Sequence, residues 1–193
     1  MSINSRTTVF AAATAVVLAM NPAIARVDVK VEFDKTFDFK PIKTWAWSSP
    51  EPGQVKMART QDDNPEAMRK RAEPVILDAV STEIGRRGLQ LAESAPGLTV
   101  TYYLLLTTNM SAQTIGQFLP ATAAWGLPPF APATQSLKMM NRGSFVLDLS
   151  ANGKVVWRGV AQAEIKMDAD DKKREAALRE AIRDLLRKYP PQP

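Results

Sequence analysis

The feature that most constrains the fold is a pair of apolar segments that meet at Asn152–Gly153. The segment before this dipeptide reads SFVLDLSA, and the segment after it reads KVVWRGVAQAEI. Asn-Gly suits a two-residue type I′ turn, since both residues tolerate a positive φ, and such a turn joins antiparallel strands. The sequence therefore predicts a β-hairpin over residues 144–165.

Regular pairing across this turn would place Asp148 opposite Trp157, and Leu147 opposite Arg158. Because side chains alternate between the faces of a strand, one face of the hairpin then carries mostly aliphatic residues, with Arg158 among them. These are Phe145, Leu147, Leu149, Val156 and Val160. We expect helices on this more apolar face. Trp157 and Asp148 would then lie on the opposite face, which would be partly open.

Three further strands are predicted from residue patterns. Polar and apolar residues alternate over Val27–Asp34, as in a half-buried strand. A short strand covers Thr44–Ser48, where two tryptophans share one face. Leu98–Met110 has apolar residues on both faces, which is typical of a central strand. Residues 49–65 are polar and rich in turn formers, so we expect a loop there.

Two stretches have the spacing of amphipathic helices. The first begins at Asn64–Pro65, which suits an N-cap followed by the first helical residue, and it ends before Gly88. The second follows Asp170 or Asp171, either of which can cap it, and carries an apolar stripe at helical spacing. Both helices can cover one face of a sheet.

The predicted fold is a two-layer α+β sandwich in the order β-β-α-β-β-β-α. It has a mostly antiparallel sheet of about five strands with two helices on one face. Residues 26–190 would form this single domain, and residues 191–193 a tail. The Pro- and Ala-rich segment 111–141 is expected to be a long loop within the domain.

The first 25 residues have the three parts of an export signal. Arg6 is the lone positive charge before an uncharged apolar stretch, and Ala23–Ala25 has small residues where a signal peptidase cleaves. A spanning helix needs about 20 apolar residues, whereas this stretch is shorter and is interrupted by Asn21–Pro22. We expect cleavage between Ala25 and Arg26, and a periplasmic protein that does not span the membrane.

The charge of the exported chain is modest. The signal holds one of the 25 Lys and Arg residues and none of the 20 Asp and Glu residues, so the remainder has a net charge of 24 − 20 = +4. Nucleic acid is not an expected partner outside the cytoplasm. The expected partner is an envelope protein, a glycan or a lipid headgroup.

The chain contains no Cys and no His. This composition excludes disulfides, Cys nucleophiles, His general bases, Ser-His-Asp triads and zinc sites built from Cys or His. Nucleotide-binding glycine motifs and serine-hydrolase motifs are also missing. From the sequence we therefore assign no catalytic, cofactor-binding or metal-binding residue and expect a protein that is not an enzyme. A hydrolase of envelope polymer that uses carboxylates or Ser and Lys is the alternative, and a structural assembly subunit is a third reading.

Aromatic side chains supply the predicted binding surface. Trp157 and Asp148 on the open face of the sheet, together with Trp125 and Phe130 from the long loop, would form it, since exposed aromatics mark interfaces. The competing interpretation is that Trp157 and its neighbours are sheet architecture alone. The expected function is that of an exported, non-catalytic binding or accessory module for an envelope component.

Three segments resemble domain-of-unknown-function family 4136. They read VEFDKTFDFKPIKTWAWS, GLTVTYYL and GSFVLDLSANGKVVWRGVAQAEI, and the resemblance extends over Val27–Tyr189. It implies an exported bacterial envelope protein, and many such proteins are lipoproteins. This chain lacks the lipid-bearing Cys, which suggests a soluble periplasmic form. The family implies no established activity, so no site residue is carried over from it.

Overall fold

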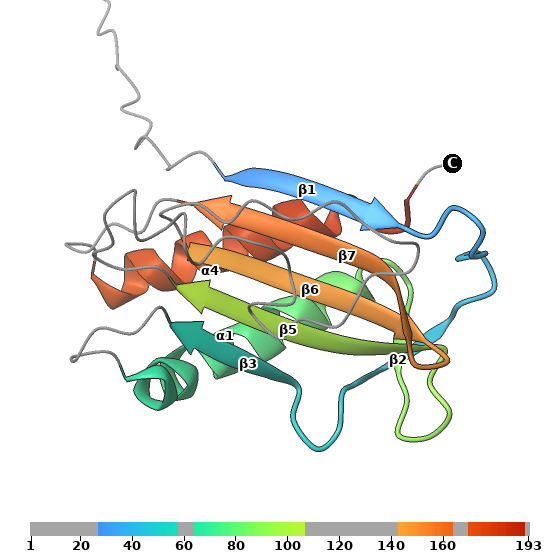
Figure 1. Ribbon diagram of the computed structural model, residues 1–193, viewed down its shortest axis with the longest axis horizontal. Coiled ribbons are helices and arrows are strands. Elements are labelled where there is room, and N and C mark those ends of the chain that lie inside the picture. The colour runs from blue at the N-terminus through green and yellow to red at the C-terminus, as the bar shows by residue number, and fades with distance from the viewer. Residues whose placement is uncertain (1–26, 58–63, 107–142, 164–169, 192–193) are drawn as a thin grey trace, which may run out of the picture.

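The computed structural model describes residues 27–57, 64–106, 143–163 and 170–191. These residues form seven strands and two helices (Figure 1). In chain order they are β1 (Asp28–Phe33), β2 (Thr44–Trp47), β3 (Gly53–Met57), α1 (Pro65–Gly85), β4 (Gln90–Leu91), β5 (Leu98–Leu106), β6 (Gly143–Ala151), β7 (Lys154–Ala163) and α4 (Asp171–Leu186). The predicted export signal and the predicted loop at 111–141 lie outside the described residues.

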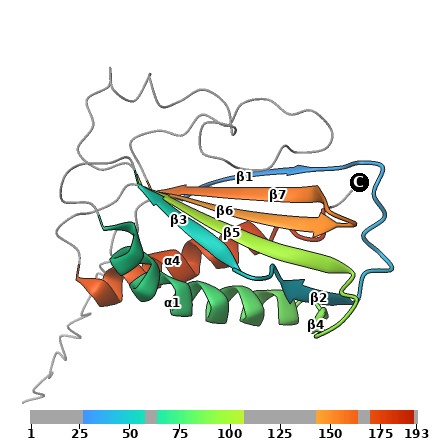
Figure 2. The ribbon, with the colours of Figure 1, turned by 60° about the horizontal axis from the view of Figure 1, so that its bottom comes forward.

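The strands form one mixed sheet in the order β1-β7-β6-β5-β2-β4, and β3 also pairs with β5. The pairs β1–β7, β7–β6 and β6–β5 are antiparallel, whereas β2 and β3 run parallel to β5. Both helices lie on the same face of this sheet (Figure 2). The predicted two layers and the placement of the helices are therefore confirmed.

The predicted strand number and order are wrong at one side of the sheet. β3 lies inside the segment that we expected to be a loop, and β4 is a two-residue strand after α1. β3 packs closely on the central strand, because a Cβ on Gly53 would lie 2.3 Å from Cδ1 of the Tyr102 ring. Its pairing thus depends on a distant partner, which the local sequence of β3 does not reveal.

The predicted helix caps are confirmed. The Asn64 side chain accepts a hydrogen bond from the Ala67 N–H at 2.9 Å, and the Asp170 side chain accepts one from the Lys173 N–H at 2.8 Å. Gly88 has a φ of +82°, a value that suits glycine after a helix end. Helix α1 continues through Pro74. The two helices are therefore fixed at the termini that the sequence indicates.

The β6–β7 turn is also confirmed, but the pairing beyond it is not regular. Asn152 and Gly153 both have a positive φ, as a type I′ turn requires. An irregularity follows between Leu149 and Ser150, so that Leu149 pairs with Trp157 and Asp148 pairs with Arg158. This one-residue β-bulge moves every later β7 side chain to the face opposite the one we expected.

The bulge places Trp157 in the core beneath α4. The indole is fully buried, and a Cβ on Gly159 would lie 2.5 Å from its ring and 2.6 Å from Leu185 of α4. The ring also makes an edge contact with Tyr189, with centroids 5.9 Å apart. Gly159 thus leaves room for an indole that is clamped between the sheet and the helix.

Candidate functional site

Two of the four residues of the predicted binding surface are buried. Trp157 is 0% exposed and Asp148 is 1% exposed, so neither can contact a partner in this structure. Trp125 and Phe130, the other two residues of that surface, lie outside the described residues. The prediction failed for Trp157 because it assumed regular pairing across the hairpin.

Asp148 instead forms a buried ion pair with Arg158 on the face away from the helices. The Arg158 guanidinium donates two hydrogen bonds to the Asp148 carboxylate, each 2.6 Å long. Glu32 of β1 pairs in register with Arg158 on its other side. Burial raises the pKa of Asp148 and of Glu32, while Arg158 opposes the rise at both. The buried pair Asp148–Arg158 thus lies beside the partly exposed Glu32.

A second polar cluster lies beside the first half of α1. Tyr102 donates a hydrogen bond to Glu73, and Arg69 forms ion pairs with Glu51 at 3.4 Å and with Glu66 at 3.5 Å. Burial is the largest cause of the raised pKa of Tyr102, and the hydrogen bond to Glu73 raises this pKa further. The ring of Tyr102 is fully buried. The hydroxyl therefore ties α1 to the central strand.

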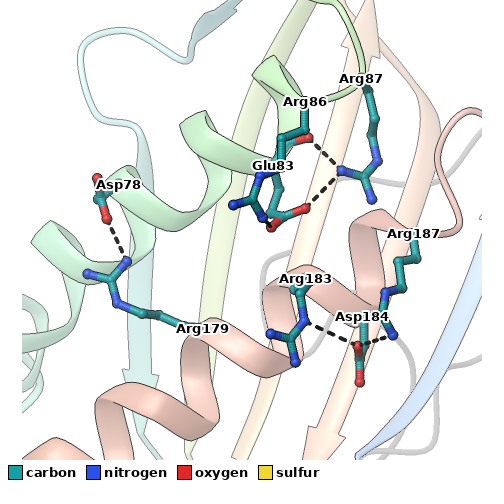
Figure 3. Close-up of polar contacts among 8 residues, drawn as sticks. All are labelled: Asp78, Glu83, Arg86, Arg87, Arg179, Arg183, Asp184 and Arg187. Carbon is teal, nitrogen blue, oxygen red and sulfur yellow. Dashed lines mark hydrogen bonds and ion pairs between the residues drawn. The ribbon is translucent and has the colours of Figure 1, made fainter.

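The seam between the helices is held by arginines (Figure 3). Arg179 of α4 pairs with Asp78 of α1, and Glu83 accepts from both Arg86 and Arg87. Arg87 also donates to the backbone carbonyls of Glu83 and Tyr189, at 2.6 and 3.1 Å. Arg86 and Arg87 directly follow α1, where cations offset the partial negative charge of the helix end. The arginines of the seam are thus engaged within the fold.

Both helices end at the same end of the molecule, next to the β1–β2 connection and the β6–β7 turn (Figure 1). The Phe39 and Tyr189 rings are 5.9 Å apart, the Gln90 N–H donates to the Lys43 carbonyl, and the Asp34 N–H donates to the Val156 carbonyl. Four distant chain segments therefore meet here. We call this region, residues 34–43, 82–97, 152–154 and 183–191, the basic end.

The basic end concentrates the positive charge of the described residues. It holds nine Lys and Arg residues and five Asp and Glu residues, a net charge of 9 − 5 = +4. The other described residues hold ten basic and eleven acidic residues, a net charge of −1. The net positive charge is thus gathered on one part of the surface. The electrostatic potential there is more positive than the same charge would give if it were spread evenly.

Five lysines of the basic end are exposed, and none of them is within ion-pair distance of a described carboxylate. They are Lys35, Lys40, Lys43, Lys154 and Lys188. Three of the five acids of this end have other partners: Glu83 and Asp184 pair with arginines, and Asp34 accepts hydrogen bonds from Thr36. The Asp38 carboxylate accepts from the Lys40 backbone N–H, Lys154 adds to the lowering of the Asp34 pKa, and Glu93 is exposed. The basic end is therefore the candidate functional site.

A model of the family described as "Domain of unknown function (DUF4136)" matches residues 29–191. The chain belongs to this family. That confirms the resemblance, and no curated protein matches the chain. Among the described residues, no group of Asp and Glu side chains is placed to hold a metal ion. None of the helices in the described ranges is long and apolar enough to cross a membrane.

Solved structures support the fold of this DUF4136 member. A DUF4136 family protein from Bacteroides thetaiotaomicron has a TM-score of 0.51 at 18% identity, over 85% of this chain and 96% of that one. A PDZ domain protein from Parabacteroides distasonis has a TM-score of 0.51 at 14% identity over 87% of this chain, which spans only 37% of that protein. At these identities the similarity shows the fold alone.

Sequence reasoning missed the basic end for a physical reason. Its five exposed lysines come from three of the four segments, between positions 35 and 188, and no short motif joins them. The sequence does contain one signal, since both helices end in basic residues, Arg86–Arg87 and Arg187–Lys188. These cations lie close together only if the two helices run parallel. The parallel arrangement follows from the sheet topology and is visible in Figure 1.

Proposed function

We propose that this protein is an exported envelope protein that acts by binding an anionic envelope component through its basic end. The observation that carries the proposal is the set of five exposed, unpaired lysines on one end of the molecule. An ammonium group without a carboxylate partner is available to a ligand at no cost in broken ion pairs. The signal-like N-terminus supports an envelope address.

Binding rather than catalysis is favoured by where the other polar groups lie. The two buried acids with the clearest partners, Asp148 and Glu83, are neutralised by arginines inside the fold. Glu73 accepts the Tyr102 hydroxyl, which is itself packed in the core. The hydrolase reading gains no specific support from these contacts, whereas the charge distribution supports a surface that attracts anions.

The export part of the proposal is tested by the N-terminus of the protein in its own cells. We expect periplasmic extract to contain a form that begins at Arg26, identified by mass spectrometry. A chain that keeps Met1 and stays in the cytoplasmic fraction would refute export. This test does not depend on what the basic end binds.

The binding part is tested by sedimentation with washed envelope fractions at low and high salt. We expect binding that weakens as salt rises, because screening shortens the reach of exposed charges. The variant Lys35→Gln, Lys40→Gln, Lys43→Gln should bind far less. Its matched control is Lys70→Gln, Lys172→Gln, Lys173→Gln, which removes the same charge from exposed positions elsewhere. Equal loss in both variants would refute the assignment to the basic end.

A further inference from the structure

We infer that the basic end docks on the surface of an anionic phospholipid bilayer, with Phe37 and Phe39 facing the interface. This inference rests on the proposed function and names the partner of the same site. The β1–β2 connection combines partly exposed rings with lysines that flank them.

Phe37 and Phe39 are partly exposed, and their centroids are 4.8 Å apart. Phe39 also contacts Phe33 of β1 and Tyr189 after α4. The rings are therefore anchored to the core on one side and reach solvent on the other. Apolar rings beside cationic side chains are the composition that proteins use to lie on a membrane interface.

Lys35 and Lys40 flank the rings, Lys154 comes from the β6–β7 turn, and Lys188 follows α4. The unpaired lysines thus come from three separate segments of the basic end. A layer of lipid phosphates extends in two dimensions and can meet all of them at once. A single polymer chain would meet only those along its path.

Lysine is a compact charge that makes no strict demand on the geometry of its partner, whereas the arginine fork recognises a carboxylate or phosphate in a fixed orientation. At the basic end, arginines such as Arg87 are engaged with the fold, and the unpaired cations are lysines. Because the unpaired cations are lysines and not arginines, a diffuse anionic surface is a better fit than a ligand that needs one fixed orientation.

The expected size of the effect follows from the lysine count. Each lysine near an anionic membrane surface strengthens binding by about fivefold. Loss of three lysines should therefore lower the partition coefficient by about a hundredfold at low salt. The effect should shrink at high salt, because the screening length falls to about 3 Å at 1 M.

The experiment is sedimentation of the protein, as isolated from expressing cells, with vesicles of phosphatidylcholine and with vesicles that also contain phosphatidylglycerol. We expect binding to the anionic vesicles alone and a loss of about a hundredfold for Lys35→Gln, Lys40→Gln, Lys43→Gln. The control Lys70→Gln, Lys172→Gln, Lys173→Gln should bind within about twofold of the wild type. Phe37→Ala should weaken binding severalfold at low and high salt alike.

Equal binding to both kinds of vesicle, or an unchanged lysine variant, would overturn the inference. A soluble anionic polysaccharide is run in parallel as a competitor and as a direct ligand. Lysine-dependent binding to the polysaccharide without vesicle binding would overturn the lipid assignment and leave the proposed function in place. No lysine-dependent binding to either probe or to envelope fractions would overturn both. Thermal unfolding of each variant confirms that it is folded.

Discussion

The β6–β7 hairpin and the basic end carry the two most distinctive groups of side chains in this molecule, and they differ in accessibility. In the hairpin, Trp157 and the pair Asp148–Arg158 are conspicuous in the sequence but completely buried. At the basic end, the lysines are inconspicuous in the sequence but exposed and unpaired. The comparison shows that conspicuous aromatic and charged residues in a strand can serve packing alone. A binding site is better sought among charged side chains that reach solvent.

The largest effect in this comparison is expected at Trp157. Replacement of a fully buried aromatic side chain by alanine should lower the free energy of unfolding by about 4 kcal/mol, because a cavity remains between β7 and α4. Urea unfolding followed by circular dichroism measures this change. Leu91→Ala is the control, since Leu91 is 64% exposed and should cost under about 0.5 kcal/mol. Similar costs for the two variants would show that the indole is not in the core.

The next effect is expected at the buried ion pair. Asp148→Ala leaves the Arg158 guanidinium without its bidentate partner and should cost about 3 kcal/mol. The double variant Asp148→Leu, Arg158→Met removes both charges and should be more stable than the single variant. Urea unfolding of the three proteins gives the comparison. A single variant within about 1 kcal/mol of the wild type would contradict the burial of this pair.

The smallest effect is spectroscopic and concerns the three tyrosines of the chain. Burial raises the pKa of Tyr102 and Tyr103, and it raises the pKa of Tyr189 to about 12, above the ordinary value of 10.0. Because the folded pKa is the higher one, the native state favours the neutral ring. This contribution to stability is present below pH 10 and is lost as the pH rises toward 12.

Absorbance of tyrosinate against pH tests this expectation. The native protein should show little tyrosinate near pH 10, and the same protein in urea should be half ionised there. A native titration that coincides with the unfolded one would mean that these rings are open to solvent. It would also contradict the packing of Tyr189 against Trp157.

Local patterns in the sequence predicted much of the fold. Asn152–Gly153 predicted the hairpin turn, and Asn64 and Asp170 predicted where the helices begin. The alternation of polar and apolar residues predicted β1. The bulge could not be predicted, because Val155 and Val156 are both apolar and suit either face of the sheet. The position of Trp157 depends on that single extra residue.

The remaining differences have a non-local origin. β3 exists because Gly53 lets a polar segment approach Tyr102, a residue 49 positions away. The basic end exists because two helices run parallel and finish beside the β1–β2 connection. Both features need the sheet topology, which no window of the sequence contains. The candidate site was thus less predictable than the secondary structure.

The most direct test of the account measures vesicle binding and unfolding on two variants that remain folded. Trp157→Phe should be destabilised yet partition onto anionic vesicles as the wild type does. The lysine variant Lys35→Gln, Lys40→Gln, Lys43→Gln should unfold within about 0.5 kcal/mol of the wild type and partition about a hundredfold more weakly. The reverse result, with binding lost on substitution of Trp157 and kept without the lysines, would contradict the account.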